Sequence, residues 1–187
     1  SVKKIFNIKK LMLIKKTDFK NLFIIEKNIF KDLRGHFHRD YCDKDLSKIN
    51  FKVKQTNISF NKKKFTLRGF HRQLPPFEER KIITCISGEI LNISIDLRRK
   101  SKTYLKIFKK KLSEKNNLSI CLPKGFANAY MTLKNNTKIF YYMSSYYKPA
   151  KEKNIRYNDK FFSIKWPNKP RFISIKDLSI PDFNPNE

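Results

Sequence analysis

The pattern that most constrains the fold is a pair of apolar runs on either side of Gly88. Residues 81–87 are mostly apolar, and residues 89–97 alternate between two faces. A side-chain period of two is typical of β-strands, so we predict two strands joined by a tight turn. In the second strand one face is Leu91, Ile93, Ile95 and Leu97, and the other is Ile90, Asn92, Ser94 and Asp96.

Similar runs recur along the chain and are separated by turn-forming Asn, Pro and Gly residues. Many short strands at this spacing are typical of an all-β barrel or a double-sheet jelly roll. We expect little helix, near residues 44–49 and in the C-terminal third, and a single domain over residues 1–187. A proline-rich tail from Pro149 is expected to wrap the barrel. The further predicted strands are 51–60, 65–73, 104–112, 118–122, 129–133 and 138–145.

The formal charge of +27 at neutral pH admits two interpretations. One is a polyanionic partner such as nucleic acid, bound by a basic β-barrel. The other is that lysines fill ordinary solvent-exposed positions. The lysines occur in short scattered runs, such as 62–64 and 109–111, and do not form one stripe. This distribution favours the second interpretation.

Targeting signals and cysteine usage indicate the compartment. No apolar run approaches the roughly 20 residues of a membrane span, and residues 1–16 lack the features of a signal peptide. Cys42, Cys85 and Cys121 are odd in number and have no C-x-x-C spacing, which argues against a disulfide framework or a zinc knuckle. We therefore expect a cytoplasmic protein.

One of only three histidines lies in a segment that suits acid–base chemistry. His71 stands between the cations Arg68 and Lys81, an arrangement that can hold an anion and move a proton beside it. The competing interpretation is a histidine whose charged neighbours are accidental. Tyrosines supply phenols as possible acids, but only one of Tyr141 and Tyr142 can face the interior of a strand pair. Spacing does not choose between them.

Metal and nucleophilic chemistry are less well supported. His36 and His38 share one strand face, which is the spacing of some jelly-roll metal sites. A third ligand is missing nearby, and Arg34 and Arg39 would repel a cation. The chain contains no Gly-x-Ser-x-Gly elbow and no glycine-rich phosphate loop. General acid–base catalysis beside a bound anion is therefore the remaining candidate chemistry.

A series of short motifs runs in a fixed order through residues 32–181. The motifs are Asp32-x-Arg34-Gly35-x-Phe37, Gln55-x-Asn57-x-Ser59, Leu67-Arg68-Gly69-x-His71-x-Gln73, Lys81, Gly88, Asp96-x-Arg98-x-x-Ser101-x-Thr103, Pro123-x-Gly125-Phe126-Ala127, Tyr141, Tyr147-x-Pro149, Asn158-Asp159, Trp166-Pro167 and Ser174-x-Lys176-Asp177. Their order and spacing resemble those of the dTDP-4-dehydrorhamnose 3,5-epimerase family. The resemblance implies a cupin-type jelly roll that works as a homodimer, without metal or cofactor, on a nucleotide-diphosphate sugar for surface polysaccharide precursors.

The resemblance also implies catalytic roles for four residues. His71 would be the base that removes a proton from the carbon next to the 4-keto group of the sugar. Asp177 would pair with that imidazole and fix its tautomer. Tyr141 would return a proton to the opposite face of the ring. Lys81 would hold the ketone oxygen as it gains charge in the enolate.

Other residues are implied to bind the substrate. Arg34 and Arg68 would hold the diphosphate, with Arg34 supplied by the partner subunit. Tyr147 and Phe37 would sandwich the nucleobase. Further substrate contacts are implied at Gln55, Asn57, Asn128 and Arg39.

Two of these positions depart from the family pattern. Arg39 stands where the family has a glutamate, and an arginine there suits guanine, which presents O6 and N7 as acceptors. We therefore hypothesise GDP in place of dTDP, unless Arg39 faces solvent. Asn128 stands where the family commonly has a histidine, so the pocket can suit a different ring, such as a heptose, or inversion at C3 only.

The sequence thus predicts an isomerase that inverts C3 and C5, or C3 alone, of a dTDP-hexose or GDP-heptose with a 4-keto group. The alternative is a basic β-barrel that binds nucleic acid. A cupin-type metal enzyme and a keto-sugar isomerase of the same fold are the remaining alternatives.

Overall fold

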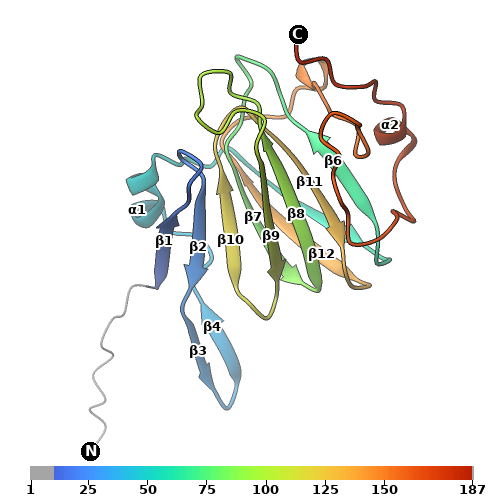
Figure 1. The fold of residues 1–187 in the computed structure, drawn as a ribbon. Coiled ribbons are helices and arrows are strands. Elements are labelled where there is room, and N and C mark those ends of the chain that lie inside the picture. The colour runs from blue at the N-terminus through green and yellow to red at the C-terminus, as the bar shows by residue number, and fades with distance from the viewer. Residues whose placement is uncertain (1–10, 187) are drawn as a thin grey trace, which may run out of the picture.

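Two antiparallel sheets pack face to face in the computed structural model, which describes residues 11–186 (Figure 1). The first sheet has the strand order β1-β2-β10-β7-β12-β5, and the second has the order β6-β11-β8-β9. The strands of the first sheet are Met12–Lys16, Phe23–Lys27, Leu118–Leu122, Lys81–Ser87, Thr137–Met143 and Gln55–Asn61. Those of the second are Leu67–His71, Phe126–Thr132, Glu89–Asp96 and Ile107–Ser113. This arrangement is the jelly roll that the sequence predicts.

A hairpin and a few short helices complete the fold. The hairpin joins β3 (Ile29–Asp32) to β4 (Gly35–His38) and projects away from the two sheets (Figure 1). The helices are α1 (Asp43–Leu46), the 3-10 turns Ser47–Ile49 and Pro149–Lys151, and α2 (Ile175–Leu178). Helical content is therefore small, as expected.

The main core lies between the sheets because the inner faces of both are apolar over most of their length. Ile83 and Ile139 of the first sheet pack in one cluster with Ile90, Leu112 and Tyr130 of the second. The alternation predicted for residues 89–97 is present, but both faces of β8 are buried. The polar members Asn92, Ser94 and Asp96 are also fully buried.

The tail after β12 explains the second buried face. Phe162, Trp166 and Phe183 pack in one cluster with Ile93 and Ile95, so the tail covers the outer side of the second sheet. This wrapping confirms the expectation for the proline-rich segment.

The tail also covers the outer edge of β6, which would otherwise be a free edge strand. Leu67 N donates to the carbonyl of Phe172 at 2.8 Å. Phe70 and Ile155 exchange two backbone hydrogen bonds of 3.0 and 3.1 Å. The strand that carries His71 is therefore held on both sides.

The predicted strands are all present, although their ends differ by a few residues. The strand predicted from residue 104 begins at Ile107, because residues 101–105 form a turn in which Leu105 has a φ of +62°. Strands β1, β2 and β3 are additional to those predicted from the sequence. In residues 11–186 no helix has the length and apolar character needed to cross a membrane.

Candidate active site

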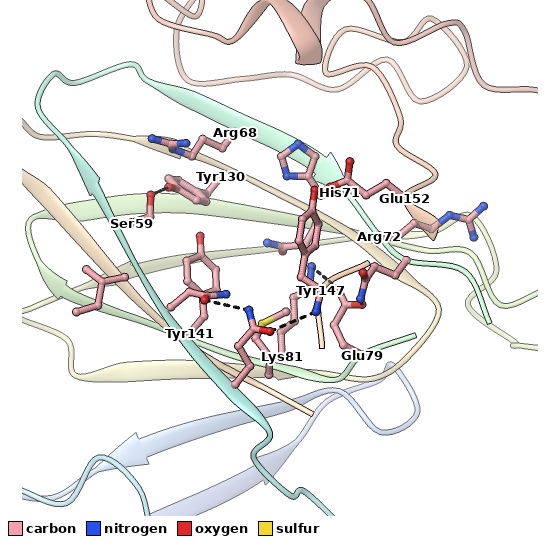
Figure 2. Close-up of a pocket in the computed structure, with 16 residues that line it drawn as sticks. Ser59, Arg68, His71, Arg72, Glu79, Lys81, Tyr130, Tyr141, Tyr147 and Glu152 are labelled. Atoms are coloured by element: carbon pink, nitrogen blue, oxygen red, sulfur yellow. Dashed lines mark hydrogen bonds and ion pairs between the residues drawn. The ribbon is translucent and has the colours of Figure 1, made fainter. Parts of the chain in front are cut away.

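A cavity of about 370 Å³ opens between the two sheets (Figure 2). Strands β5, β7 and β12 of the first sheet and β6 and β11 of the second supply most of its walls. The segment after β12 adds further side chains. The lining includes these sequence-predicted residues: Gln55, Asn57, Arg68, His71, Lys81, Asn128, Tyr141 and Tyr147.

An irregularity of β6 brings Arg68 and His71 to the same cavity. Residues three apart on a regular strand point to opposite faces. Here the pairing with β11 shifts register between Asn128 and Tyr130, and Gly69 has a φ of +113°. A Cβ at Gly69 would lie 2.5 Å from the carbonyl oxygen of Asn128, so only glycine fits.

His71 forms a close pair with Asp177, which comes from α2 in the tail. His71 Nε2 lies 2.7 Å from Asp177 Oδ1, and the carboxyl is almost fully buried. Ser174 caps α2 by accepting from Asp177 N at 3.0 Å, which fixes the start of the helix. Burial opposes ionisation of Asp177, but the hydrogen bond and charge of the imidazole outweigh it and lower the pKa of this carboxyl.

Tyr141, and not Tyr142, faces the cavity. Burial is the main cause that raises the pKa of Tyr141 well above its ordinary value, and the neighbouring Tyr130 hydroxyl adds to it. The phenol therefore keeps its proton at neutral pH. The Tyr142 ring lies on the other face of β12, where it stacks on Tyr41 and its hydroxyl donates to Asp40 Oδ2 at 2.5 Å. The structure thus resolves the choice that spacing left open.

Lys81 enters the cavity beside a buried acid that sequence reasoning missed. Lys81 Nζ lies 2.8 Å from Glu79 Oε1, and their side chains are only 13% and 4% exposed. The other oxygen, Glu79 Oε2, accepts from Gln73 Nε2 at 2.8 Å. The available signal was the spacing of two between Glu79 and Lys81, which places both on one side of an extended segment.

A second cluster of hydrogen-bonded polar side chains surrounds Arg68 in the cavity. Arg68 Nε donates to Asn61 Oδ1 at 3.0 Å, and Asn61 Nδ2 donates to the Tyr130 hydroxyl at 3.2 Å. Ser59 Oγ lies 2.9 Å from the same hydroxyl. These bonds hold the guanidinium of Arg68, which lines the cavity, through its Nε. Tyr130 was not singled out from the sequence, because nothing in its local pattern distinguishes it from a core residue.

The remaining lining residues hold one another in place. Gln55 Nε2 donates to Asn57 Oδ1 at 3.1 Å, and Gln55 Oε1 accepts from Tyr147 N at 3.2 Å. The Tyr147 hydroxyl donates to Glu152 Oε1 at 3.0 Å, so the ring stands at the rim of the cavity. Asn128 Oδ1 accepts from Ser94 Oγ at 2.8 Å.

Three predicted binding residues lie on or beside the hairpin of β3 and β4, which projects away from the sheets (Figure 1). None of the three lines the cavity of its own chain. The Arg34 side chain is 91% exposed and pairs with Asp32. Phe37 is 66% exposed. Arg39 Nη1 lies 3.6 Å from Asp45 Oδ2, at the base of the hairpin.

The two histidines of the hairpin stack on each other. Their ring centres, those of His36 and His38, lie 5.7 Å apart. Within residues 11–186, no group of three or more His, Cys, Asp or Glu side chains is placed to hold a metal ion.

Known proteins resemble this chain over most of its length. The model of the dTDP-4-dehydrorhamnose 3,5-epimerase family matches residues 16–185. The enzyme of that name from Shigella flexneri is 30% identical over 166 residues, which are 88% of this chain and 92% of the relative. The one from Salmonella typhimurium is 31% identical over 174 residues, which are 92% of this chain and 93% of the relative.

Solved structures agree with the sequence relatives. The crystal structure of the epimerase from Bacillus anthracis, with TDP and PPi bound, has a TM-score of 0.87 and 31% identity, over 92% of this chain and 99% of that one. The enzyme from Legionella pneumophila in complex with dTDP-4-keto-L-rhamnose has a TM-score of 0.84 and 30% identity, over 90% and 91% of the two chains. The chain therefore belongs to the dTDP-4-dehydrorhamnose 3,5-epimerase family.

Proposed function

We propose that the protein epimerises a dTDP-linked 4-keto-6-deoxy sugar at C3 and C5 by removing and returning protons. The observation that carries this proposal is the placement of a base and an acid on opposing sheets of one cavity. His71 belongs to β6 of the second sheet, and Tyr141 belongs to β12 of the first (Figure 2). Inversion of a carbon centre needs a base on one face of the ring and an acid on the other.

His71 is arranged to act as the base. Its Nε2 is occupied by the ionised Asp177, which can only accept, so Nε2 carries the proton and Nδ1 is the free acceptor. When Nδ1 takes a proton from the substrate, the imidazole becomes a cation. The carboxylate at 2.7 Å then stabilises this cation.

Lys81 and Tyr141 act on the intermediate. A ketone acidifies the hydrogens on both neighbouring carbons, because the charge passes to its oxygen. The Lys81 ammonium is placed to stabilise that oxygen, as a preorganised charge in the wall of the cavity. The Tyr141 phenol, which keeps its proton in the resting site, then donates to the other face of the enolate carbon.

The proposed nucleotide is dTDP, in place of the GDP hypothesis. Relatives whose structures contain TDP or a dTDP-sugar are 31% and 30% identical to this chain over most of its length. Arg39, on which the GDP hypothesis depended, lies next to Asp45 in its own chain. These epimerase relatives also give no support to a nucleic-acid-binding barrel.

Deuterium incorporation from heavy water tests the activity. The protein is incubated with a dTDP-linked 4-keto-6-deoxyglucose and, separately, with its GDP counterpart, and label is followed by NMR. We expect label at C3 and C5 together with inverted product from the dTDP sugar. Label at C3 alone would restrict the activity to one carbon. Absence of label from both substrates would contradict the proposal, and preference for the GDP sugar would restore the hypothesis based on Arg39.

We also propose a homodimer in which each hairpin completes the cavity of the partner. Arg34 and Phe37 are exposed and lie outside the cavity of their own chain, although a diphosphate and a nucleobase need such residues. A cytoplasmic location is proposed as well, because Cys42, Cys85 and Cys121 are free thiols, which is typical of a reducing compartment.

Mixing two inactive variants tests the shared site. We expect Arg34→Ala and His71→Asn to be inactive separately, and a mixture dissociated and reassembled in equal amounts to recover about a quarter of the wild-type activity. Half of the random dimers combine the two chains, and one of their two cavities has both residues intact. No recovery in a mixture shown to exchange subunits would place Arg34 in its own chain's site.

Acid stability offers a separate check on the His71–Asp177 pair. The pKa of Asp177 is lower in the folded state than in the unfolded chain, so its stabilising effect is present above the ordinary value of about 3.9 and is lost as pH falls below it. We expect the free energy of unfolding of wild type to exceed that of Asp177→Asn at pH 6, and the difference to shrink toward pH 2–3, measured by urea unfolding. Asp32→Asn is the control, since Asp32 pairs with Arg34 at the surface and should show little change. A constant difference across this pH range would contradict the assignment.

A further inference from the structure

The side chain of Lys81, which is proposed to stabilise the ketone oxygen, is held in place by a neighbouring acid. Lys81 Nζ is held at 2.8 Å by Glu79 Oε1, and both side chains are nearly buried (Figure 2). A lysine has four flexible carbon–carbon bonds, and an ammonium stabilises an oxyanion well only when its position is fixed before the charge develops. Glu79 supplies that fixed point.

The carboxylate is itself anchored from behind. Gln73, also buried, donates from Nε2 to Glu79 Oε2 at 2.8 Å and to the carbonyl of Phe77 at 2.9 Å. Its Oε1 accepts from Lys148 N at 2.5 Å. Glu79 therefore cannot rotate away without breaking a bond at each oxygen, and the lysine inherits this restraint.

The pairing of both Glu79 oxygens also reduces the repulsion between this carboxylate and the enolate. An unpaired carboxylate near an enolate would oppose the charge that develops there. Each Glu79 oxygen instead has a hydrogen-bond donor, so its negative charge is paired within the protein. The ammonium has three N–H donors, of which Glu79 takes one, and the other two remain for the substrate oxygen.

We infer that Glu79 is a positioning residue for the epimerase reaction, acting through Lys81 on the enolate oxygen. This inference rests on the proposed function of Lys81. It does not make Glu79 a proton donor or acceptor, because Lys81 occupies one of its oxygens and Gln73 the other.

A set of four variants tests the inference. Glu79→Gln keeps the size of the side chain and removes its charge, and Lys81→Met removes the ammonium. The double variant combines the two changes. Glu78→Gln makes the same change of charge one residue away, outside the residues that line the cavity, and is the matched control. Each is assayed for deuterium incorporation into the dTDP sugar, for dTDP binding by calorimetry and for thermal unfolding.

We expect Glu79→Gln to slow label incorporation about 30-fold, because loss of one oxyanion donor costs about 10²–10³-fold and a misplaced donor keeps part of its effect. Its dTDP affinity should stay within about twofold of wild type, since the change acts in the transition state. The double variant should be no more than about threefold slower than Lys81→Met, because the two residues act as one unit. Glu78→Gln should match wild type.

Two results would overturn the inference. One is a Glu79→Gln enzyme as fast as wild type, and the other is a double variant whose loss equals the product of the two single losses. If Glu79→Gln does not fold, Glu79→Asp keeps the charge but shortens the side chain by one methylene, and a wild-type rate there is equally contradictory. If the wild-type protein incorporates no label, the proposed function itself is contradicted. That result differs from the two outcomes above, in which the wild-type protein is active.

Discussion

Replacing His71 with asparagine is expected to abolish deuterium incorporation at both C3 and C5. His71 lines the cavity while its Nε2 is held by Asp177, and no other imidazole lines the cavity among the described residues. Asparagine can still bond Asp177 but cannot take up a proton. Loss of a general base costs about 10²–10⁴-fold, so the rate should fall near the detection limit.

The control for this result is the integrity of the fold and of the nucleotide site. dTDP binding of His71→Asn should stay close to wild type. Thermal stability should fall only by the contribution of the His71–Asp177 pair, because the substitution leaves the core between the sheets untouched. Persistent label at one carbon would show that a second base serves that carbon. Glu152 would then be the residue to test, since it also lines the cavity.

Replacing Tyr141 with phenylalanine is expected to separate exchange from inversion. His71 can still remove a proton and return deuterium to the same face, so label should enter at a rate within about tenfold of wild type. Inverted product needs a proton on the opposite face, which phenylalanine cannot supply. We therefore expect formation of the inverted sugar to fall by about 10²-fold or more, followed by NMR of the same sample.

The neighbouring tyrosine provides a matched control. Tyr142→Phe removes the same hydroxyl one residue along, but that hydroxyl bonds Asp40 on the outer face of the sheet. We expect this variant to lose some stability and to keep both exchange and inversion. If Tyr141→Phe forms inverted product at the wild-type rate, the acid must be another group.

The apolar runs on either side of Gly88 were sufficient to predict β7 and β8, because a period of two is a local property of the chain. They did not show that the two strands lie in different sheets, which depends on pairing with distant strands. The choice between Tyr141 and Tyr142 was not predictable in this way. It depends on which face of β12 meets the second sheet, and that is set by contacts with residues far away in the chain. The same reason explains why the pairing of His71 with Asp177, 106 positions apart, rested on resemblance and not on spacing.

Glu79 and Tyr130 were missed for a different reason. A buried acid is recognised by its partners, and those of Glu79 are the side chains of Gln73 and Lys81, which a bend of the chain brings together. The hairpin shows the opposite case. Its residues Arg34 and Phe37 were identified from sequence, yet one chain does not bring them to the cavity. The role proposed for them requires a second copy of the chain, which no local sequence pattern describes.

The position of α2 in the tail has a consequence for biosynthesis. A nascent chain that ends before Ser174 already contains every strand, including the one with His71, but lacks the carboxylate that orients the imidazole. Catalytic activity should therefore appear only after the ribosome has synthesised α2. Until then, the incomplete chain should be inactive.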